Sequence, residues 1–413
     1  RTDRVEVPPV SESARPVSPK QQPAKGNMSS HSVFNRLAAR HLVTRLGRYG
    51  LFFGALAALA TLSLATQVAA AEWTVVASGL NNPRGLDFAP NGALYIAEAG
   101  VGGDGPVVPG AEGEMHFGPS GSITRVFKGV QTRIVTGLPS LAQEGGFAAV
   151  GPSAVSFGPL GHALVTIGLG QPPAVRSTVL GASAASMAGL FQLAQNGQMK
   201  AVADLGAFEA MNDPDGQGPD TNPNGVLADT AGGSYVTDAG ANALLRIDAR
   251  GRVSVVAVFP NRLVDTPPFL PQPPFPAQLP MQAVPTNVVR GPDGALYVSQ
   301  LTGFPFPVGG ARIYRVVPGS APTVYAEGFT NIIDLAFDAH GNLYVLEIDQ
   351  NGLLAPDVTG RLARVNAGDG SVDTVASDGL VMPGGLVIGR DGAIYISNYS
   401  TAPGAGEVVR IEP

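Results

Sequence analysis

Hydrophobic and polar residues alternate in short runs along this chain, and one such pattern recurs six times. Each copy has an alternating apolar run, a tight turn containing Gly, and a second alternating run that usually contains Tyr. Alternation at period two is typical of a strand with one buried face, and dipeptides such as Asn91-Gly92 and Asp293-Gly294 are typical of hairpin turns. The pattern therefore predicts two antiparallel strands at each of 82–97, 151–166, 222–237, 284–299, 331–346 and 382–397.

A second hairpin follows in most copies. Alternating runs at 311–317 and 322–328 form one such pair, and runs at 360–366 and 371–377 form another. Four short antiparallel strands in each of six repeats predict an all-β fold, a six-bladed β-propeller. The first three repeats are longer than the roughly 40 to 50 residues of a bare blade, so they carry insertions.

The two ends of the repeat array complement each other. The last copy ends with the strand at 406–413, one strand short of a blade, while an unmatched run, WTVVASGL at 73–80, precedes the first copy. We predict a ring closed by the N-terminal strand 73–80 pairing into the last blade. Such pairing removes an exposed strand edge that would otherwise invite aggregation.

The residues before the repeats have a different character. Residues 1–27 are rich in Pro, Ser, Lys and Gln, so we expect them to be disordered or to precede a true translation start at Met28. Residues 28–71 have a basic region, an apolar run at 51–65 and an A-x-A site at 69–71, which predict a secretory signal peptide. The alternative is an uncleaved anchor, but the run is short for a span of roughly 20 residues. We expect a secreted propeller at 72–413, periplasmic or extracellular, without stable membrane insertion.

Composition narrows the classes of function. The net charge is −6 and the basic residues concentrate in the predicted signal peptide, which argues against nucleic-acid binding. The chain has no cysteine, so disulfides and thiolate metal sites are excluded. We expect a monomer whose partner is a small molecule or a protein.

The insertions fall on one predicted face. In a four-stranded meander, the first-to-second and third-to-fourth connections share one face of the propeller, and here they are all short. The long segments all belong to the other connections: 100–120, 137–152, 168–188, 205–222, 262–284, 302–310, 348–359 and 399–405. We call the face that carries them the long-loop face and expect the functional site there, because loops on a rigid scaffold carry function.

Polar residues end the second strand of five repeats on this face. We predict that they line the rim of a central channel and bind a ligand, although a ring of merely solvated residues has the same pattern. The segment 301–310 adds an apolar lip or, alternatively, packing fixed by proline. The predicted ligand-binding residues are Glu98, Asp238, Asn242, Gln300, Glu347, Asn398, Phe304 and Phe306.

The loop at 212–225 concentrates Asp and Asn side chains. Oxygen ligands at this density suit Ca²⁺, but clusters of Asp, Asn, Gly and Pro are also ordinary turn chemistry, and turns are the preferred interpretation. The spacing does not match an EF-hand. No G-x-S-x-G motif is present, and catalytic residues are unknown.

Several segments are specific enough to indicate a family. DTNPNGV at 220–226, LTGFPFPVGGARIYRV at 301–316 and GFTNIIDLAFDAHGNLYVLEI at 328–348 resemble the ScyD/ScyE family of secreted NHL-like propellers. The resemblance covers 72–413. It implies a six-bladed fold and export, but no catalytic residues. Our leading hypothesis is a secreted propeller that binds a ligand or partner on its long-loop face without catalysis.

A more distant similarity offers an alternative, a Ca²⁺-dependent hydrolase of the lactonase type or an isomerase. The lactonase and gluconolactonase propellers place Asn or Asp two residues before the first-strand apolar residue in several blades, converging on a channel metal. Asn224 matches that position here, whereas Asn287 and Asp334 are each displaced by one residue. These three are the speculative ligands of a metal, Ca²⁺ being the possible cofactor.

Overall fold

The computed structural model describes residues 73–412, apart from 111–112, 160 and 231. The predicted signal peptide and the segment 1–27 lie outside the described residues. Within the described part of the chain, no helix is long and apolar enough to span a membrane.

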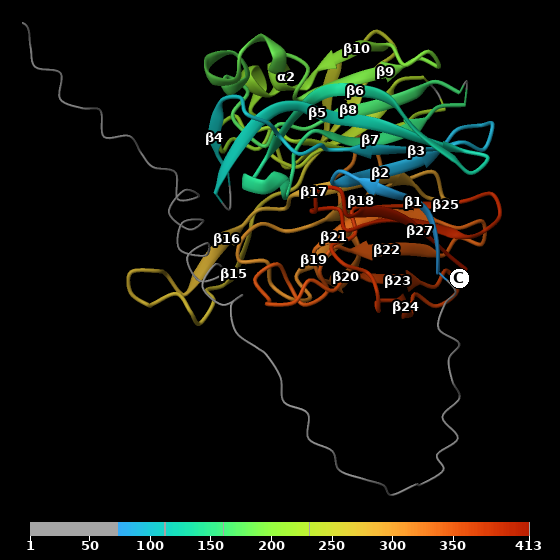
Figure 1. Ribbon diagram of the computed structural model, residues 1–413. Helices are drawn as coiled ribbons and strands as arrows, with labels where there is room; N and C mark the ends of the chain where they lie inside the picture. The colour runs from blue at the N-terminus through green and yellow to red at the C-terminus, as the bar shows by residue number, and fades with distance from the viewer. Residues whose placement is uncertain (1–72, 111–112, 160, 231, 413) are drawn as a thin grey trace, which may run out of the picture.

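Six antiparallel sheets form the blades of a β-propeller, which confirms the fold predicted from the repeats (Figure 1). The innermost strands contact one another in ring order and enclose a central channel. Blade 1 contains β2 (Pro83–Phe88), β3 (Leu94–Glu98), β5 (Glu114–Phe127) and β6 (Val130–Ala142). Blade 2 contains β7 (Pro152–Phe157), β8 (Ala163–Ile167), β9 (Gly189–Leu193) and β10 (Met199–Asp204). Blade 3 contains β11 (Pro223–Ala228), β12 (Ser234–Asp238), β13 (Ala243–Ile247) and β14 (Val253–Val258).

The remaining three blades follow the same order from the channel outward. Blade 4 contains β17 (Pro285–Arg290), β18 (Leu296–Gln300), β19 (Ala311–Val316) and β20 (Thr323–Phe329). Blade 5 contains β21 (Ile332–Phe337), β22 (Leu343–Glu347), β23 (Arg361–Val365) and β24 (Val372–Ala376). Blade 6, the last, contains β25 (Gly385–Ile388), β26 (Ile394–Asn398), β27 (Gly406–Ile411) and β1 (Trp73–Leu80).

The last blade closes the ring as predicted. β1 pairs antiparallel with β27, so that Trp73 lies opposite Ile411 and Leu80 opposite Gly406. The first described strand therefore provides the outer edge of the blade whose other three strands come from the end of the chain.

The long connections all join second strands to third strands or one blade to the next, which confirms the predicted division into two faces. They carry additional elements. A short strand pairs with β5, and a two-stranded hairpin between blades 3 and 4 projects from the body (Figure 1); neither was predicted. These elements are β4 (Val107–Pro109), η1 (Glu144–Gly146), η2 (Arg176–Leu180), η3 (Ala182–Ala184), α2 (Leu205–Asn212), β15 (Arg262–Asp265) and β16 (Gln278–Met281).

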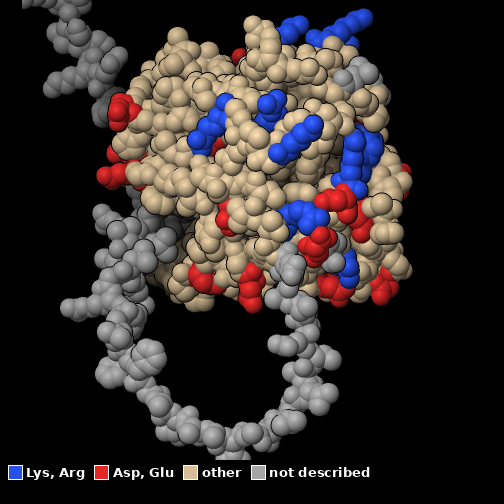
Figure 2. Space-filling view, turned by 45° about the vertical axis from the view of Figure 1, so that its right-hand side comes forward, with Lys and Arg blue, Asp and Glu red and all other residues tan. Residues whose placement is uncertain are grey.

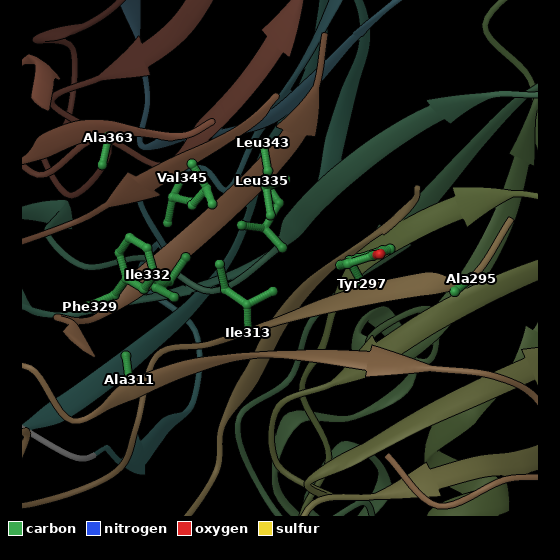
Figure 3. Packing of buried hydrophobic residues seen from close by; sticks show 11 residues of the cluster. Ala295, Tyr297, Ala311, Ile313, Phe329, Ile332, Leu335, Leu343, Val345 and Ala363 are labelled. Atoms are coloured by element: carbon green, nitrogen blue, oxygen red, sulfur yellow. The ribbon is translucent and has the colours of Figure 1, made fainter. Parts of the chain in front are cut away.

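The hydrophobic core lies between neighbouring blades. Blades 4 and 5 pack through Ile313, Leu335 and Val345, which are at most 1 % exposed (Figure 3). The tyrosine that recurs in the repeats packs edge-on against the next blade: the ring centroids of Tyr297 and Phe337 lie 4.9 Å apart. Burying a large apolar side chain contributes about 2 kcal/mol, so these inter-blade layers hold the ring together.

Hydroxyl side chains join consecutive inner strands. Thr166, Thr237 and Ser397 occupy the same position of the second strand in three blades. Their hydroxyls donate to inner-strand carbonyls of the following blade, at 2.6, 3.0 and 2.8 Å respectively. The free edge of an inner strand presents unpaired carbonyls, and buried carbonyls need partners. We call these contacts the hydroxyl staples.

Candidate functional site

Glu98 and Glu347, the strand-end carboxylates, are buried inside blades 1 and 5. Neither is exposed to solvent. Glu98 accepts from the Asn81 backbone N–H at 2.8 Å and pairs with Arg133 at 2.8 Å. Glu347 likewise accepts from the backbone N–H of the residue that precedes the inner strand by two positions, at 2.6 Å, and pairs with Arg361. Each carboxylate therefore fixes the turn that leads into the inner strand.

Asp238 and Asn398 do the same without an arginine, whereas Gln300 contacts the third strand of its blade, β19. Asp238 accepts from the Thr221 hydroxyl at 2.6 Å, and Asn398 Oδ1 accepts from the Val381 N–H at 2.8 Å. Gln300 Oε1 accepts from a backbone N–H at 3.1 Å, while its buried Nε2 has no partner. None of the five strand-end side chains is among those that line the channel cavity in the described residues. Ligand binding by these five residues at the channel rim stays a prediction.

The remaining predicted ligand-binding residues lie in long loops. Asn242 is buried, accepts from the Val284 N–H at 2.9 Å and donates to Asp215 at 2.8 Å. Phe304 and Phe306 are half-buried and pack edge to face, with ring centroids 6.2 Å apart. Asn242 is thus part of the junction between blades 3 and 4, and the predicted apolar lip stays a prediction.

The central channel holds a cavity of about 260 Å³ lined by the six inner strands. Most lining side chains are aliphatic, and the polar ones concentrate on five of the six strands. The polar lining residues are Asp87, Ser153, Ser156, Asn224, Thr286, Asn287 and Asp334. On the face that Figure 2 shows, charged side chains lie scattered among a larger area of other residues, whereas two carboxylates lie together in the channel cavity.

Asp334 is one of these two channel carboxylates. It comes from β21, is 6 % exposed, and accepts from the backbone N–H groups of Leu335 and Leu386 at 2.6 and 2.8 Å. The Asn287 amide also donates to it. Burial raises the pKa of Asp334 to about 7, with a smaller contribution from the charge of Asp87, while the hydrogen bonds oppose the rise.

Asp87 is the second channel carboxylate, and the sequence prediction missed it. It comes from β2, is partly exposed to the channel, and accepts from Phe88 and Phe157 backbone N–H groups, both at 2.7 Å. Burial raises its pKa to about 6, opposed by these two hydrogen bonds. The available signal was an Asp directly after the apolar residue of the inner strand, a position that holds Ser, Leu, Val or Ala in the other copies.

The three speculative metal ligands all line the channel but do not form a calcium site. Asn287 turns its amide N–H, not its oxygen, toward Asp334. Ca²⁺ requires six to eight oxygen ligands. Within the described ranges, no three acidic or His side chains are grouped to hold a metal. The donor set therefore does not fit the ion.

Arg84 is a cation without an acidic partner at the long-loop side of the same ring. It occupies the position of β2 that corresponds to Asn224 in β11, and it donates to the Ala149 carbonyl at 2.7 Å. No carboxylate pairs with it among the described residues. Burial lowers its pKa to about 10. The channel thus has an unpaired cation in its wall and unpaired carboxylates within.

Comparison with known proteins agrees with the fold class. No protein-family model matches this chain, and no curated protein matches it. A solved protein of unknown function from Bacteroides thetaiotaomicron is similar, with a TM-score of 0.51 and 12 % identity over 83 % of this chain and 76 % of that one. Virginiamycin B lyase from Staphylococcus aureus has a TM-score of 0.46 and 13 % identity over 83 % of this chain and 100 % of the lyase. At such identities the likeness concerns the fold alone, that of six-bladed β-propeller proteins.

Proposed function

We propose that this protein is a ligand-binding propeller whose central channel takes a small, polar, cationic molecule. The observation that carries the proposal is the pair of channel carboxylates. Asp87 and Asp334 line one cavity, and neither pairs with a cation in the described part of the chain.

A cationic ligand would stabilise the ionised forms of the two channel carboxylates. A carboxylate that is buried without an opposite charge is destabilised in its ionised form, which is why the pKa of each channel carboxylate is raised. An ammonium group in the cavity would favour ionisation and would donate charge-assisted hydrogen bonds. Small-molecule pockets usually enclose about 300 to 1,000 Å³, so a cavity of about 260 Å³ suits a ligand of the size of a sugar or smaller.

Matched probes test this proposal. We expect amino sugars and amino alcohols to bind, as measured by calorimetry and thermal shift. Their hydroxyl counterparts should bind at least tenfold more weakly; glucose, for example, should bind more weakly than glucosamine. Binding of the amines should strengthen from pH 5 to pH 8, because Asp87 and Asp334 lose their protons between these values.

Variants connect binding to the channel. Asp87→Asn and Asp334→Asn should each weaken amine binding, whereas Asp373→Asn, a change of the same chemistry on the exposed edge strand β24, should leave it unchanged. Equal binding of amines and their hydroxyl counterparts, or binding insensitive to both channel variants, would contradict the proposal.

A second candidate is an enzyme that uses the same two residues for acid–base catalysis. The favouring observation is that two carboxylates in one cavity have pKa values of about 6 and about 7. A general acid or base works best when its pKa lies near the operating pH. In hydrolysis of a lactone or ester, the ionised carboxylate would take a proton from the attacking water, and the protonated one would give a proton to the leaving alkoxide.

Turnover separates the two candidates. Hydrolysis of a lactone panel, followed by proton release, should give a bell-shaped rate profile between pH 5 and pH 8 if the enzyme proposal holds. Asp87→Asn and Asp334→Asn should each remove one limb of that profile. An amine that binds without turnover of any lactone or ester would favour the binding propeller.

Export and family membership complete the proposal. The ScyD/ScyE-like segments and the signal-like segment 28–71 support a secreted protein of that NHL-like family. Expression with the full leader in a bacterial host should yield a processed protein whose N-terminus, determined by mass spectrometry, is Glu72. An unprocessed chain retained in the cytoplasm would contradict export.

A further inference from the structure

Helix α2 on the long-loop face buries an acidic side chain that has no partner. Glu209 is 1 % exposed, and neither of its carboxylate oxygens has a hydrogen-bond partner. A buried, unpaired carboxylate is costly, and such groups usually pair with a cation or bind a metal. The end of α2 and the loop 213–220 that follows it surround this side chain.

The neighbours of Glu209 are themselves acidic. Burial, together with the charges of Asp238, Asp215 and Asp213, raises the pKa of Glu209 to about 8. The Asp220 backbone N–H opposes part of this rise without reaching hydrogen-bond geometry. No Lys or Arg in the described part of the chain pairs with any of these five carboxylates.

The loop itself has the predicted turn chemistry. Asp215 accepts from the Gln217 N–H at 3.0 Å, and Asp213 accepts from the Gly218 N–H at 3.1 Å. These bonds show that the segment forms turns of the predicted kind. They use only part of the acceptor capacity of the two carboxylates, since each oxygen has two lone pairs.

We propose that Glu209 and the loop 213–220 bind a divalent cation of the size of Ca²⁺. All its side-chain donors are oxygens, and Ca²⁺ accepts carboxylates, carbonyls and water in a flexible shell of six to eight ligands. The described residues do not group three acidic side chains around one point, so main-chain carbonyls and water must complete the shell. Mg²⁺ demands stricter octahedral geometry and fits such a loop less well.

Binding there would stiffen the junction between two blades. Asp215 is joined to Asn242, and Asn242 in turn accepts from the backbone of Val284 at the entry to blade 4. A cation between Glu209 and Asp215 would therefore tie α2, the loop and the turns of blades 3 and 4 together. This site is separate from the channel and independent of its ligand.

Calorimetric titration of CaCl₂ into the full chain tests the proposal. We expect one Ca²⁺ per chain, with a dissociation constant at or below about 1 mM as in extracellular calcium modules, and at least tenfold weaker binding of MgCl₂. Glu209→Gln should weaken Ca²⁺ binding at least tenfold. Glu144→Gln, which changes an exposed carboxylate on the same face, should not alter it.

Thermal unfolding gives a readout that a purely structural role would not produce. Without Ca²⁺ and at pH 9, where a group with a pKa of about 8 is ionised, Glu209→Gln should raise the melting temperature, because it removes a buried charge among like charges. With Ca²⁺, the wild type should gain stability and the variant should not. A double variant, Asp213→Asn with Asp215→Asn, changes partly exposed loop residues and checks the loss of binding should Glu209→Gln fold poorly. No binding at about 10 mM CaCl₂, or binding unchanged in both variants, overturns the proposal.

Discussion

The strand-end carboxylates and the channel carboxylates are both buried, yet their surroundings differ. Glu98 and Glu347 each have an arginine from an outer strand of the same blade. Asp87 and Asp334 have only N–H donors around them. In blades 1 and 5 the propeller thus neutralises the carboxylate that closes a turn, whereas along the channel it leaves the carboxylates without a cation. Buried charge with a partner holds the fold, and buried charge without one remains available to a ligand.

Removing an arginine from the first set should have the largest effect. Arg361→Met leaves Glu347 buried without its partner, and breaking a buried ion pair from one side costs about 3 to 5 kcal/mol. Chemical denaturation should show this loss as a lower midpoint with an unchanged slope. A loss below about 1 kcal/mol would mean that Glu347 depends on its backbone donor rather than on the arginine.

Replacing a channel carboxylate should change the pH dependence of stability. The pKa of Asp334 is about 7 in the folded protein and 3.8 as its ordinary value. Between these values the folded state keeps a proton that the unfolded state has released, so the free energy of unfolding falls as pH rises toward 7. In Asp334→Asn this fall between pH 5 and pH 8 should be smaller by roughly 2 kcal/mol.

The Asp334→Asn experiment has an internal reference. Asp373→Asn alters an exposed carboxylate whose pKa is lowered chiefly by hydrogen bonds from Asn366 and Arg364. Its stability curve should therefore run parallel to that of the wild type between pH 5 and pH 8. Parallel curves for Asp334→Asn and wild type would remove the distinction between the two sets of carboxylates.

A hydroxyl staple should contribute less than a buried ion pair. Thr237→Val removes the donor to the Thr286 carbonyl and the acceptor of the Gly225 N–H, both buried, at a cost of about 1 to 3 kcal/mol. Thr323→Val, on the exposed outer strand β20, is the matched control and should stay within about 0.5 kcal/mol of wild type. Equal effects of the two changes would show that the staples do not secure the inner strands.

The smallest effect is expected for an exposed ion pair. Arg364 and Asp373 lie on the outer strands of blade 5, and their side chains are 34 % and 53 % exposed. Arg364→Met should therefore cost less than about 1 kcal/mol, in contrast to Arg361→Met on the same strand, β23. A loss as large as that of Arg361→Met would show that burial does not separate these pairs.

The architecture was readable from the sequence because each repeat is a local pattern. Alternation and turn dipeptides specify hairpins without knowledge of distant residues, and the unmatched run 73–80 specified the closure. The candidate site was less readable. The sequence shows that Glu98 ends a strand, but its direction is set by Arg133, which lies 35 residues further along on β6. Asp87 was missed because one Asp within an apolar alternation has no local signature, and its role follows from the cavity that six distant strands enclose.

The pairing of β1 with β27 also sets an order of events during synthesis. β1 is translated before every other strand of the propeller, and its partner is translated after all of them. The hydrogen-bonding edge of the earliest strand therefore stays unpaired until the last strand of the propeller has been translated. A chain released before β27 is made would leave β1 unpaired and the last blade without its two outer strands, and such unfinished chains should be the ones that quality-control proteases remove.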